Sequence, residues 1–348
     1  MRLTKLEERE LTKYIEYFDF RDYLKDKTFL ITGSKGIMGS GLIKWILYEN
    51  MVHGTNAHVI ASTRNPDNIP DYFDDNDNIE FCKFGSELEA CKEKTIDYVL
   101  HAAAPTNNRV LKAQPVESLR VIIDGTEALI KIAKEHNSTM LYFSSAEAYG
   151  TPSIDKPLPE DYVGAVDSLN TRSCYTLGKK VAELMCKSYF EEYDVDVRII
   201  RPTVILGLWQ PYDSVKVEAE LMRCVVENTD FTMKSDGSTK KSVIYSLDAV
   251  SAALTVLFKG KAGETYNATN PETYCSVKER AEQIRNTFNK NINIVFAPVD
   301  TSVSEGYLPK YMLLEDITKI SNIGWKPYAD MDYIFSIDIE RFKDLKKC

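Results

Sequence analysis

The sequence lacks the features that mark membrane, secreted and nucleic-acid-binding proteins. None of its apolar runs approaches the ~20 residues of a membrane-spanning helix, and residues 1–26 are too charged for a signal peptide. Positive charge is not in excess. The formal net charge is −9, which disfavours nucleic acid or an anionic membrane surface as the main partner. We therefore expect a cytoplasmic protein that holds any phosphate-bearing ligand with backbone amides and a few cations.

Patterns of metal ligation are also missing. The seven cysteines form no Cys-x-x-Cys pair and only four histidines are present, so we expect no metal site. Reduced thiols in a cytosol account for the cysteines most simply. Hydrophobic residues make up 44% and charged residues 27%, which is ordinary for a globular protein. A chain of 348 residues is long enough for one large α/β domain with an appended lobe.

What the sequence does contain is a glycine-rich turn between a hydrophobic strand, 28–32, and an apolar helix, 38–50. A helix N-terminus offers free N–H groups and a positive dipole, and missing side chains let a pyrophosphate approach the backbone. The position of the turn favours dinucleotide binding over a purely structural role. The predicted cofactor-binding residues of this turn are Gly33, Ser34, Gly36, Ile37, Met38 and Gly39.

Short apolar runs alternate with helical stretches as far as about residue 205, and this rhythm predicts an α/β fold with a Rossmann-type, doubly wound parallel sheet. We expect an N-terminal helical extension (1–26), a dinucleotide-binding domain (27–205) and a smaller C-terminal α/β substrate lobe (206–348) whose chain is free to cross back to the sheet. The predicted strands are 28–32, 57–62, 79–82, 97–102, 139–144 and 196–201, then 241–245 and 292–296 in the lobe. The predicted helices are 38–50, 86–93, 115–136 and 173–193, then 216–228, 248–259 and 276–288 in the lobe.

The strongest chemical signal comes from two segments far apart in the sequence. Ser145 follows the strand 139–144, while Tyr175 and Lys179 lie four residues apart on one face of a helix. A lysine ammonium near a phenol is expected to lower the pKa of the tyrosine and give an acid/base usable near neutral pH. Ser145 is placed to hydrogen-bond the same substrate oxygen. The Tyr-x-x-x-Lys spacing alone arises by chance among 20 tyrosines, so the prediction depends on its combination with Ser145 and the glycine turn.

The order of these motifs resembles that of one family. The segments GSKGIMG (33–39), HAAAP (101–105), SSAEAYG (144–150), YTLGK (175–179) and RP (201–202) are similar to those of the extended short-chain dehydrogenase/reductases. More narrowly, they resemble the NAD(P)-dependent nucleotide-sugar epimerases, dehydratases and decarboxylases, over roughly residues 27–330.

The resemblance implies roles for individual residues. Tyr175 would remove a sugar hydroxyl proton while hydride passes to the nicotinamide, and Lys179 would also bond the nicotinamide ribose. The resemblance adds Ala102, Ala103 and Pro202 to the cofactor site, and Pro105 to the substrate site.

Glu147 is the residue that separates the reactions of this family. An acid two residues beyond Ser145 resembles enzymes that remove a C–H proton next to a new ketone, or that act after decarboxylation. The 4,6-dehydratases carry Asp-Glu here, whereas this chain has Ala146 before Glu147. The pattern Ser-x-Glu-x-Tyr-Gly, followed by Arg172-Ser-Cys-Tyr, most resembles the UDP-glucuronate decarboxylases, with Arg172 expected to bind substrate. The alternative for Glu147 is a carboxylate that only orients substrate hydroxyls.

Three positions depart from the decarboxylase pattern. Lys241 stands where the decarboxylases carry an arginine, and a lysine contacts phosphate or carboxylate without forming a bidentate fork. Val204 and Ile122 each stand where an asparagine is usual. These departures point to an unusual nucleotide sugar, or to an enzyme that performs one half of the redox cycle.

The second predicted strand carries the information on cofactor choice. In NAD-dependent enzymes an acidic residue ends this strand and hydrogen-bonds the adenosine ribose. Here the strand ends in Thr63-Arg64-Asn65-Pro66, and the nearest acid, Asp67, lies past the proline. Arg64 is placed to meet a 2′-phosphate, or else stacks on the adenine of either cofactor. We therefore expect NAD(P) as cofactor, with a preference for NADP.

Two classes of function remain after these observations. The first is an enzyme that oxidises a nucleotide-linked sugar transiently at C4 and then epimerises, eliminates or decarboxylates it, serving surface polysaccharide biosynthesis. A variant is an NADP-dependent keto-sugar or carbonyl reductase. The second class is a non-catalytic dinucleotide-sensing regulator, which has no reason to keep Ser145, Tyr175 and Lys179 together. By resemblance, helices 115–136 and 173–193 are expected to form a four-helix interface in a homodimer.

Overall fold

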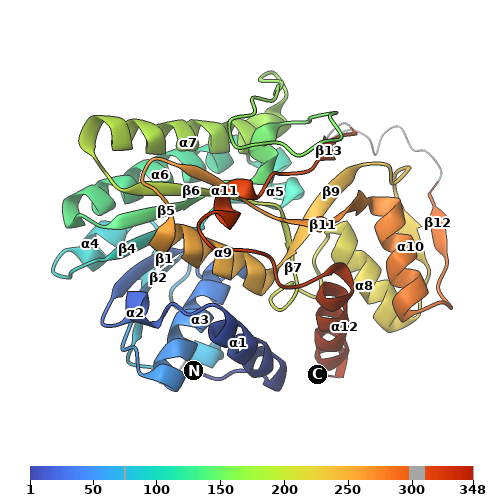
Figure 1. The fold of residues 1–348 in the computed structure, drawn as a ribbon, viewed down its shortest axis with the longest axis horizontal. Coiled ribbons are helices and arrows are strands. Elements are labelled where there is room, and N and C mark those ends of the chain that lie inside the picture. Colours follow the sequence, from blue (N-terminus) through green and yellow to red (C-terminus); the bar gives the residue numbers. More distant parts are fainter. Residues whose placement is uncertain (74–75, 298–309, 348) are drawn as a thin grey trace.

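The central element of the structure is a seven-stranded parallel sheet, seen in a computed structural model that describes residues 1–73, 76–297 and 310–347 (Figure 1). From β1, an interior strand, the chain runs outward through β2 and β3, then restarts on the other side of β1 with β4 and continues to β5 and β6. This reversal between β1 and β4 is the place where open α/β sheets bind ligands. The strands, in spatial order, are β10 (Thr265–Ala268), β6 (Val197–Pro202), β5 (Thr139–Phe143), β4 (Tyr98–His101), β1 (Thr28–Thr32), β2 (His58–Thr63) and β3 (Ile79–Lys83).

Helices cover both faces of this sheet. α3 (Ile37–His53) and α9 (Ser246–Lys259) pack on one face, and α6 (Pro115–His136) and α7 (Cys174–Tyr193) on the other (Figure 1). Successive residues of β1 point to opposite faces, as Phe29 and Ile31 join the first core cluster and Leu30 the second. The predicted doubly wound α/β fold is therefore confirmed. Shorter helices α4 (Glu87–Cys91) and α5 (Asn108–Ala113) complete this part of the chain.

A smaller lobe follows β6 and lies beside the carboxyl edge of the sheet (Figure 1). Its main sheet pairs β9 with β7, β11 and β13, and a separate pair joins β8 to β12. The strands of the lobe are β7 (Val204–Leu206), β8 (Phe231–Met233), β9 (Lys240–Tyr245), β11 (Asn270–Ser276), β12 (Ile294–Phe296) and β13 (Met312–Leu313). Its helices are α8 (Val217–Glu227), α10 (Val277–Phe288) and α12 (Met331–Lys347), while the short α11 (Thr318–Ser321) packs against β10 of the main sheet. Within the described ranges, no helix has both the length and the apolar character needed to cross a membrane.

The predicted elements are present with boundaries shifted by a few residues at most, but several others were missed. β10 adds a seventh strand to the main sheet, because the chain leaves the lobe and pairs in parallel with β6. Helices α5, α11 and α12 and the lobe strands β7, β8, β11 and β13 were not predicted either. Residues 298–309 and 348 of the predicted lobe lie outside the described residues, and the division into domains stays a prediction.

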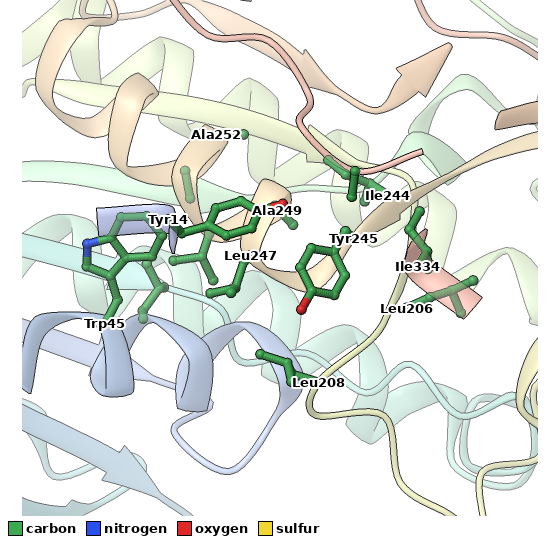
Figure 2. Close-up of a cluster of buried hydrophobic side chains, with 14 of the residues drawn as sticks. Tyr14, Trp45, Leu206, Leu208, Ile244, Tyr245, Leu247, Ala249, Ala252 and Ile334 are labelled. Carbon is green, nitrogen blue, oxygen red and sulfur yellow. The ribbon is translucent and has the colours of Figure 1, made fainter. Parts of the chain in front are cut away.

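The N-terminal segment forms α1 (Lys5–Tyr17) and α2 (Arg21–Leu24), which pack on the outer side of α3 and α9 (Figure 1). A capping box between Thr4 and Glu7 starts α1 and satisfies two of its free amides. Tyr14 lies between Trp45 and Tyr245, beside Leu247 and Ala249 of α9, in Figure 2. This segment therefore contributes to the main hydrophobic core.

Candidate active site

A cleft of about 320 Å³ opens at the carboxyl edge of the main sheet and is closed on its other side by residues of the lobe. It is lined by the glycine turn, by the ends of β4, β5 and β6, and by the start of α7. Eleven of the residues predicted from the sequence line it: Gly36, Ile37, Met38, Gly39, Ala102, Ser145, Glu147, Tyr175, Lys179, Pro202 and Lys241. A second hollow, of about 430 Å³, lies at the opposite edge of β1, β2 and β3 and contains none of them.

The glycine turn is packed so tightly that side chains are excluded from it. Gly33 has a φ of +71°, and a Cβ there would lie 2.9 Å from the backbone of Ala102 and Ala103. A Cβ at Gly39 would lie 2.2 Å from the carbonyl oxygen of Gly33. Helix α3 begins directly after Gly36, and the first N–H groups of a helix have no partner within it. The turn therefore has the backbone geometry of an anion site.

Two of the predicted cofactor residues, Ser34 and Ala103, support this turn from behind and do not line the cleft. The Ser34 hydroxyl donates to the Ser62 carbonyl oxygen at 3.0 Å. The Ala103 amide donates to the Thr32 hydroxyl at 3.3 Å, which ties the end of β4 to β1. Their contact with a cofactor, like that of Gly33, stays a prediction.

The end of β5 is held by a buried polar network. The Ser144 hydroxyl donates to Glu183, whose carboxylate also receives two hydrogen bonds from Arg201, at 2.8 and 2.7 Å. The next residue, Ser145, caps a short 3-10 helix, η2 (Ala146–Tyr149), by accepting from the Glu147 amide at 3.1 Å. The orientation of Ser145 and Glu147 toward the cleft is thus fixed from β5 and α7 together.

Tyr175 and Lys179 lie on the inner face of α7, and both are buried. The Lys179 ammonium donates to the Phe143 carbonyl oxygen at 2.5 Å and lies 4.8 Å from the ring centre of Tyr142. Its distance to the ring centre of Tyr175 is 5.9 Å. Burial lowers the pKa of Lys179 to about 7, although the Glu183 carboxylate opposes this change.

The predicted effect of Lys179 on Tyr175 is wrong. Burial raises the pKa of the Tyr175 phenol well above its ordinary value, and the nearby Glu147 carboxylate raises it further. A hydrogen bond from Ser145 and the positive charge of Arg172 lower the pKa without reversing its net rise. The i, i+4 spacing brings the two residues to one face, but the lysine head is directed to Phe143.

Arg172 contacts the predicted second base. It belongs to η3 (Thr171–Ser173), just before α7, and its Nη2 lies 3.2 Å from the Glu147 Oε2. Its Nε donates to the Asn108 side-chain oxygen at 3.0 Å. Arg172 is absent from the cleft lining while Glu147 is part of it. The predicted contact of Arg172 with substrate stays a prediction.

The lobe side of the cleft carries a cluster of cations. Lys241 and Arg280 each lie 3.2 Å from the same oxygen of the buried Glu218. Burial opposes ionisation of Glu218, but the two cations lower its pKa to about 2. Lys216, which the sequence analysis missed, also lines the cleft, and burial lowers its pKa. The sequence contained a signal for this residue. A lysine at the start of the predicted helix 216–228 is unfavourable beside the positive end of the helix dipole, which indicates a role other than stabilising the helix.

The turn after β2 lies beside the glycine turn. Arg64 is exposed at its tip, and the Lys35 ammonium donates to the carbonyl oxygens of Asn65, at 3.2 Å, and Asn68. Lys35 was missed by the sequence analysis, although it directly precedes a glycine of the motif. Two cations therefore stand where a ribose-binding acid is usual in NAD-dependent folds.

The other singled-out positions differ in their placement. Pro105 is half-buried and does not line the cleft, although its neighbours Ala104 and Thr106 do. Val204 lines the cleft, whereas Ile122 is buried in the core between the sheet and α6. In the part of the chain that the structure describes, no cluster of three or more histidine, cysteine or acidic side chains has the arrangement of a metal site.

Comparisons with known proteins agree with this geometry. The model of the NAD dependent epimerase/dehydratase family matches residues 29–269. A curated relative is UDP-glucuronic acid decarboxylase 2 of Arabidopsis thaliana, 26% identical over 317 residues, which are 90% of this chain and 68% of that protein.

Solved structures share the fold. UDP-glucose 4-epimerase of Thermotoga maritima, determined with UDP-glucose, has a TM-score of 0.79 at 19% identity, over 92% of this chain and 99% of that one. UDP-glucuronic acid 4-epimerase of Bacillus cereus, determined with NAD, has a TM-score of 0.74 at 20% identity, over 92% and 97%.

Proposed function

The chain belongs to the NAD dependent epimerase/dehydratase family, and from this premise we propose that it modifies a nucleotide-activated sugar through a transient 4-keto intermediate. The observation that carries the proposal is the convergence of Ser145, Glu147, Tyr175 and Lys179 on one cleft with the glycine turn. A dinucleotide-sensing regulator is the weaker candidate, because sensing requires no buried tyrosine and lysine beside a serine and a carboxylate.

In the first step, Tyr175 takes the proton of the sugar C4 hydroxyl while Ser145 orients that oxygen. NAD(P), held at the glycine turn, would supply the hydride acceptor when bound. Of this chain's own groups, the Ser145 hydroxyl and the Arg172 guanidinium oppose the burial and the Glu147 carboxylate that raise the pKa of Tyr175. Lys179 is partly neutral near pH 7, so we assign it to holding the nicotinamide ribose as a hydrogen-bond donor.

In the second step, Glu147 acts on the 4-keto sugar. Oxidation at C4 acidifies the neighbouring C–H bonds, and a carboxylate at the cleft is able to remove or return such a proton. The absence of an acid at Ala146 disfavours 4,6-dehydration. The Arabidopsis thaliana relative is a decarboxylase of UDP-glucuronic acid, and this sugar is our first candidate substrate. Epimerisation is the second candidate, and a plain NADP-dependent keto-sugar reductase is the third.

We place the substrate diphosphate on the lobe side of the cleft. Lys216 and Lys241 line it there, and the single carboxylate of Glu218 is shared with Arg280, so the cluster carries an excess of positive charge. Lysines contact phosphates as point charges, which suits Lys241 in place of an arginine. This assignment makes residues 206–348 the substrate lobe and 27–205 the dinucleotide-binding domain.

For the cofactor, we propose a preference for NADP over NAD. Arg64 at the tip of β2 and Lys35 in the glycine turn provide two cations for a 2′-phosphate, and no acid occupies the strand end. Replacing Arg64 with glutamate is expected to reverse the preference, measured as the ratio of dissociation constants for NADP and NAD.

We also propose a homodimer in which α6 and α7 of two protomers form a four-helix interface. The two helices pack against each other, and apolar side chains on their outer sides are exposed, among them Val116, Val181 and Leu184. A change of Leu184 to glutamate should then yield monomers, measured as mass in solution. The cytoplasmic location and the role in polysaccharide synthesis stay predictions.

The test of the proposed function is incubation with a panel of nucleotide sugars and either cofactor, with products followed by mass spectrometry and NMR. Tyr175→Phe should abolish hydride transfer and leave cofactor binding largely intact, while the exposed Tyr193→Phe on the same helix serves as control. Glu147→Gln should retain C4 oxidation and lose the later step. Appreciable turnover by Tyr175→Phe would refute the assignment, and survival of both steps in Glu147→Gln would reduce Glu147 to a binding residue.

The state of the cofactor separates the remaining alternatives. Tight retention of the cofactor with no net redox change indicates a recycling enzyme of the epimerase or decarboxylase type. Stoichiometric consumption of NADPH indicates a reductase. Binding of dinucleotide with no turnover of any sugar or carbonyl compound would favour the regulator.

A further inference from the structure

Arg172 is buried behind the carboxylate that the proposed function assigns to the second step. Its side chain is 7% exposed, whereas that of Glu147 is 34% exposed and faces the cleft. A guanidinium in this position reaches the cleft only through Glu147. This placement differs from that of Lys216 and Lys241, which line the cleft themselves.

The guanidinium is anchored on two sides. Nη2 lies 3.2 Å from Glu147 and Nε donates to the Asn108 side chain at 3.0 Å. Nη1 is buried and has no hydrogen-bond partner among the described residues. The Arg172 backbone is fixed as well, because its amide donates to the Asn170 side chain at 3.0 Å. Through its single Nη2 contact, a buried guanidinium held in this way restricts the Glu147 carboxylate more than an exposed, freely moving side chain would.

Glu147 is therefore held at both its backbone and its side chain. The Ser145 hydroxyl accepts from its backbone amide, and Arg172 holds its side chain. Tyr175 is three residues beyond Arg172, at the start of α7, so one short stretch of chain carries both the acid/base and the cation that restrains the second carboxylate.

The same ion pair acts on Tyr175. The charged or titratable groups that face Tyr175 are Glu147 from η2, Arg172 from η3, Lys179 from its own helix and Tyr142 from β5. Glu147 raises the pKa of the phenol and Arg172 lowers it, so each charge offsets part of the other. Loss of Arg172 alone leaves the negative charge of Glu147 unbalanced beside Tyr175, which should raise the pKa of the phenol further. Loss of both charges removes both effects on that pKa.

We propose that Arg172 is a positioning residue that aims the Glu147 carboxylate into the cleft and balances its charge beside Tyr175, without contacting the substrate. The inference rests on the proposed function, because Glu147 and Tyr175 have their roles from it. It replaces the expectation that Arg172 binds substrate.

The test is a double-mutant cycle with Arg172→Gln, Glu147→Gln and the double variant, with Arg172→Lys as the conservative replacement. Arg21→Gln, which breaks an exposed arginine–carboxylate pair with Asp19, is the matched control. Three properties are measured in each variant: the thermal unfolding midpoint, the KM for the nucleotide sugar, and the pH dependence of cofactor reduction by UDP-glucuronic acid under single-turnover conditions.

If Arg172 acts through Glu147, the hydride-transfer profile of Arg172→Gln moves to higher pH, and the rate near pH 7 falls roughly tenfold for each pH unit by which the profile moves. In the Glu147→Gln background the same change should have little effect, so the double variant transfers hydride about as fast as Glu147→Gln alone. Arg172→Lys should recover part of the loss, and the unfolding midpoints should be non-additive. The control should match the wild type in all three properties.

The inference is overturned if Arg172→Gln raises the KM for the nucleotide sugar by the same factor in both backgrounds, because that result is the signature of a substrate contact. Additive unfolding midpoints would overturn it as well, since they show that the two side chains do not interact. If the wild type oxidises no nucleotide sugar, the proposed function fails, and the unfolding midpoints alone decide whether the pair exists.

Discussion

Lys179 is a buried cation whose replacement should raise stability while it removes activity. Its side chain lies in the core beneath the cleft, with a residue exposure of 2%, and burial lowers its pKa from the ordinary 10.5 to about 7. The perturbation that tests this is Lys179→Met, which keeps the length of the side chain and removes the charge. We expect loss of hydride transfer together with a more stable fold.

The magnitude follows from proton linkage. The unfolded chain keeps the Lys179 proton up to about pH 10.5, whereas the folded chain releases it near pH 7, so the unfolded state binds more protons in between. The free energy of unfolding of the wild type therefore rises with pH, by about 2 kcal/mol between pH 7 and pH 9. The free-energy cost of burying the protonated Lys179 side chain is largest below pH 7, where it amounts to about 5 kcal/mol.

Removing the buried charge should stabilise Lys179→Met, but the loss of two contacts offsets part of this stabilisation. The Phe143 carbonyl oxygen loses its donor, which costs about 1–3 kcal/mol for a buried acceptor. The contact of the ammonium with the Tyr142 ring is lost as well. Near pH 7, Lys179→Met should thus be more stable than the wild type by roughly 1–3 kcal/mol.

The assay is urea unfolding of both proteins at several values between about pH 6 and pH 9. Lys187→Met, on the exposed side of the same helix, is the control and should follow the wild-type pH dependence. The difference between wild type and Lys179→Met should shrink as the pH rises. A variant that is less stable at every pH, with the same slope as the wild type, would show that Lys179 keeps an ordinary pKa in the fold.

Three further predictions concern the turn and the buried charges. Gly39→Ala should weaken NAD(P) binding at least roughly tenfold in calorimetric titrations, because the added Cβ would lie 2.2 Å from a backbone oxygen. The control is Gly54→Ala, whose Cβ would have no atom within 4 Å. It should cost only ~1 kcal/mol of stability, because Gly54 has a positive φ. Burial raises the pKa of Glu315 to about 8, so the free energy of unfolding of the wild type falls as the pH rises from about 4.5 to 8. In urea unfolding, Glu315→Gln should therefore be more stable than the wild type near pH 8 but not near pH 5. Lys44→Met leaves Glu7 charged and buried and should cost ~3–5 kcal/mol in thermal unfolding, part of which Glu7→Gln should restore in the double variant.

The fold could be predicted to the extent that local patterns determine it. Strand 28–32 and helix 115–136 match the structure to the residue, because the strand is a bounded apolar run and the helix has a long amphipathic repeat that starts at a proline. β10 was missed, because its four residues carry no strand pattern of their own. It is a strand because β6 presents an unpaired edge to it, and that edge exists only in the assembled sheet.

The site was predictable for a different reason. The carboxyl ends of parallel strands meet at one edge, so the motif residues after β1, β4, β5 and β6 converge wherever such a sheet forms. The lobe side was less accessible to sequence reasoning. Lys216 reaches the cleft because of where α8 packs, and Arg172 pairs with Glu147 because η3 lies beside η2. Neither arrangement can be predicted from the spacing of residues along the sequence.

The relation between Lys179 and Tyr175 marks the limit of reasoning from spacing. Four residues along a helix determine that two side chains share a face, but they do not determine where a long flexible side chain directs its charge. The strand end under α7 supplies the Phe143 carbonyl oxygen, and the ammonium takes it. Burial then removes much of the lysine's charge near pH 7 and leaves the phenol under the opposed influence of Glu147 and Arg172. The basicity of Tyr175 is therefore a property of three segments brought together by the fold.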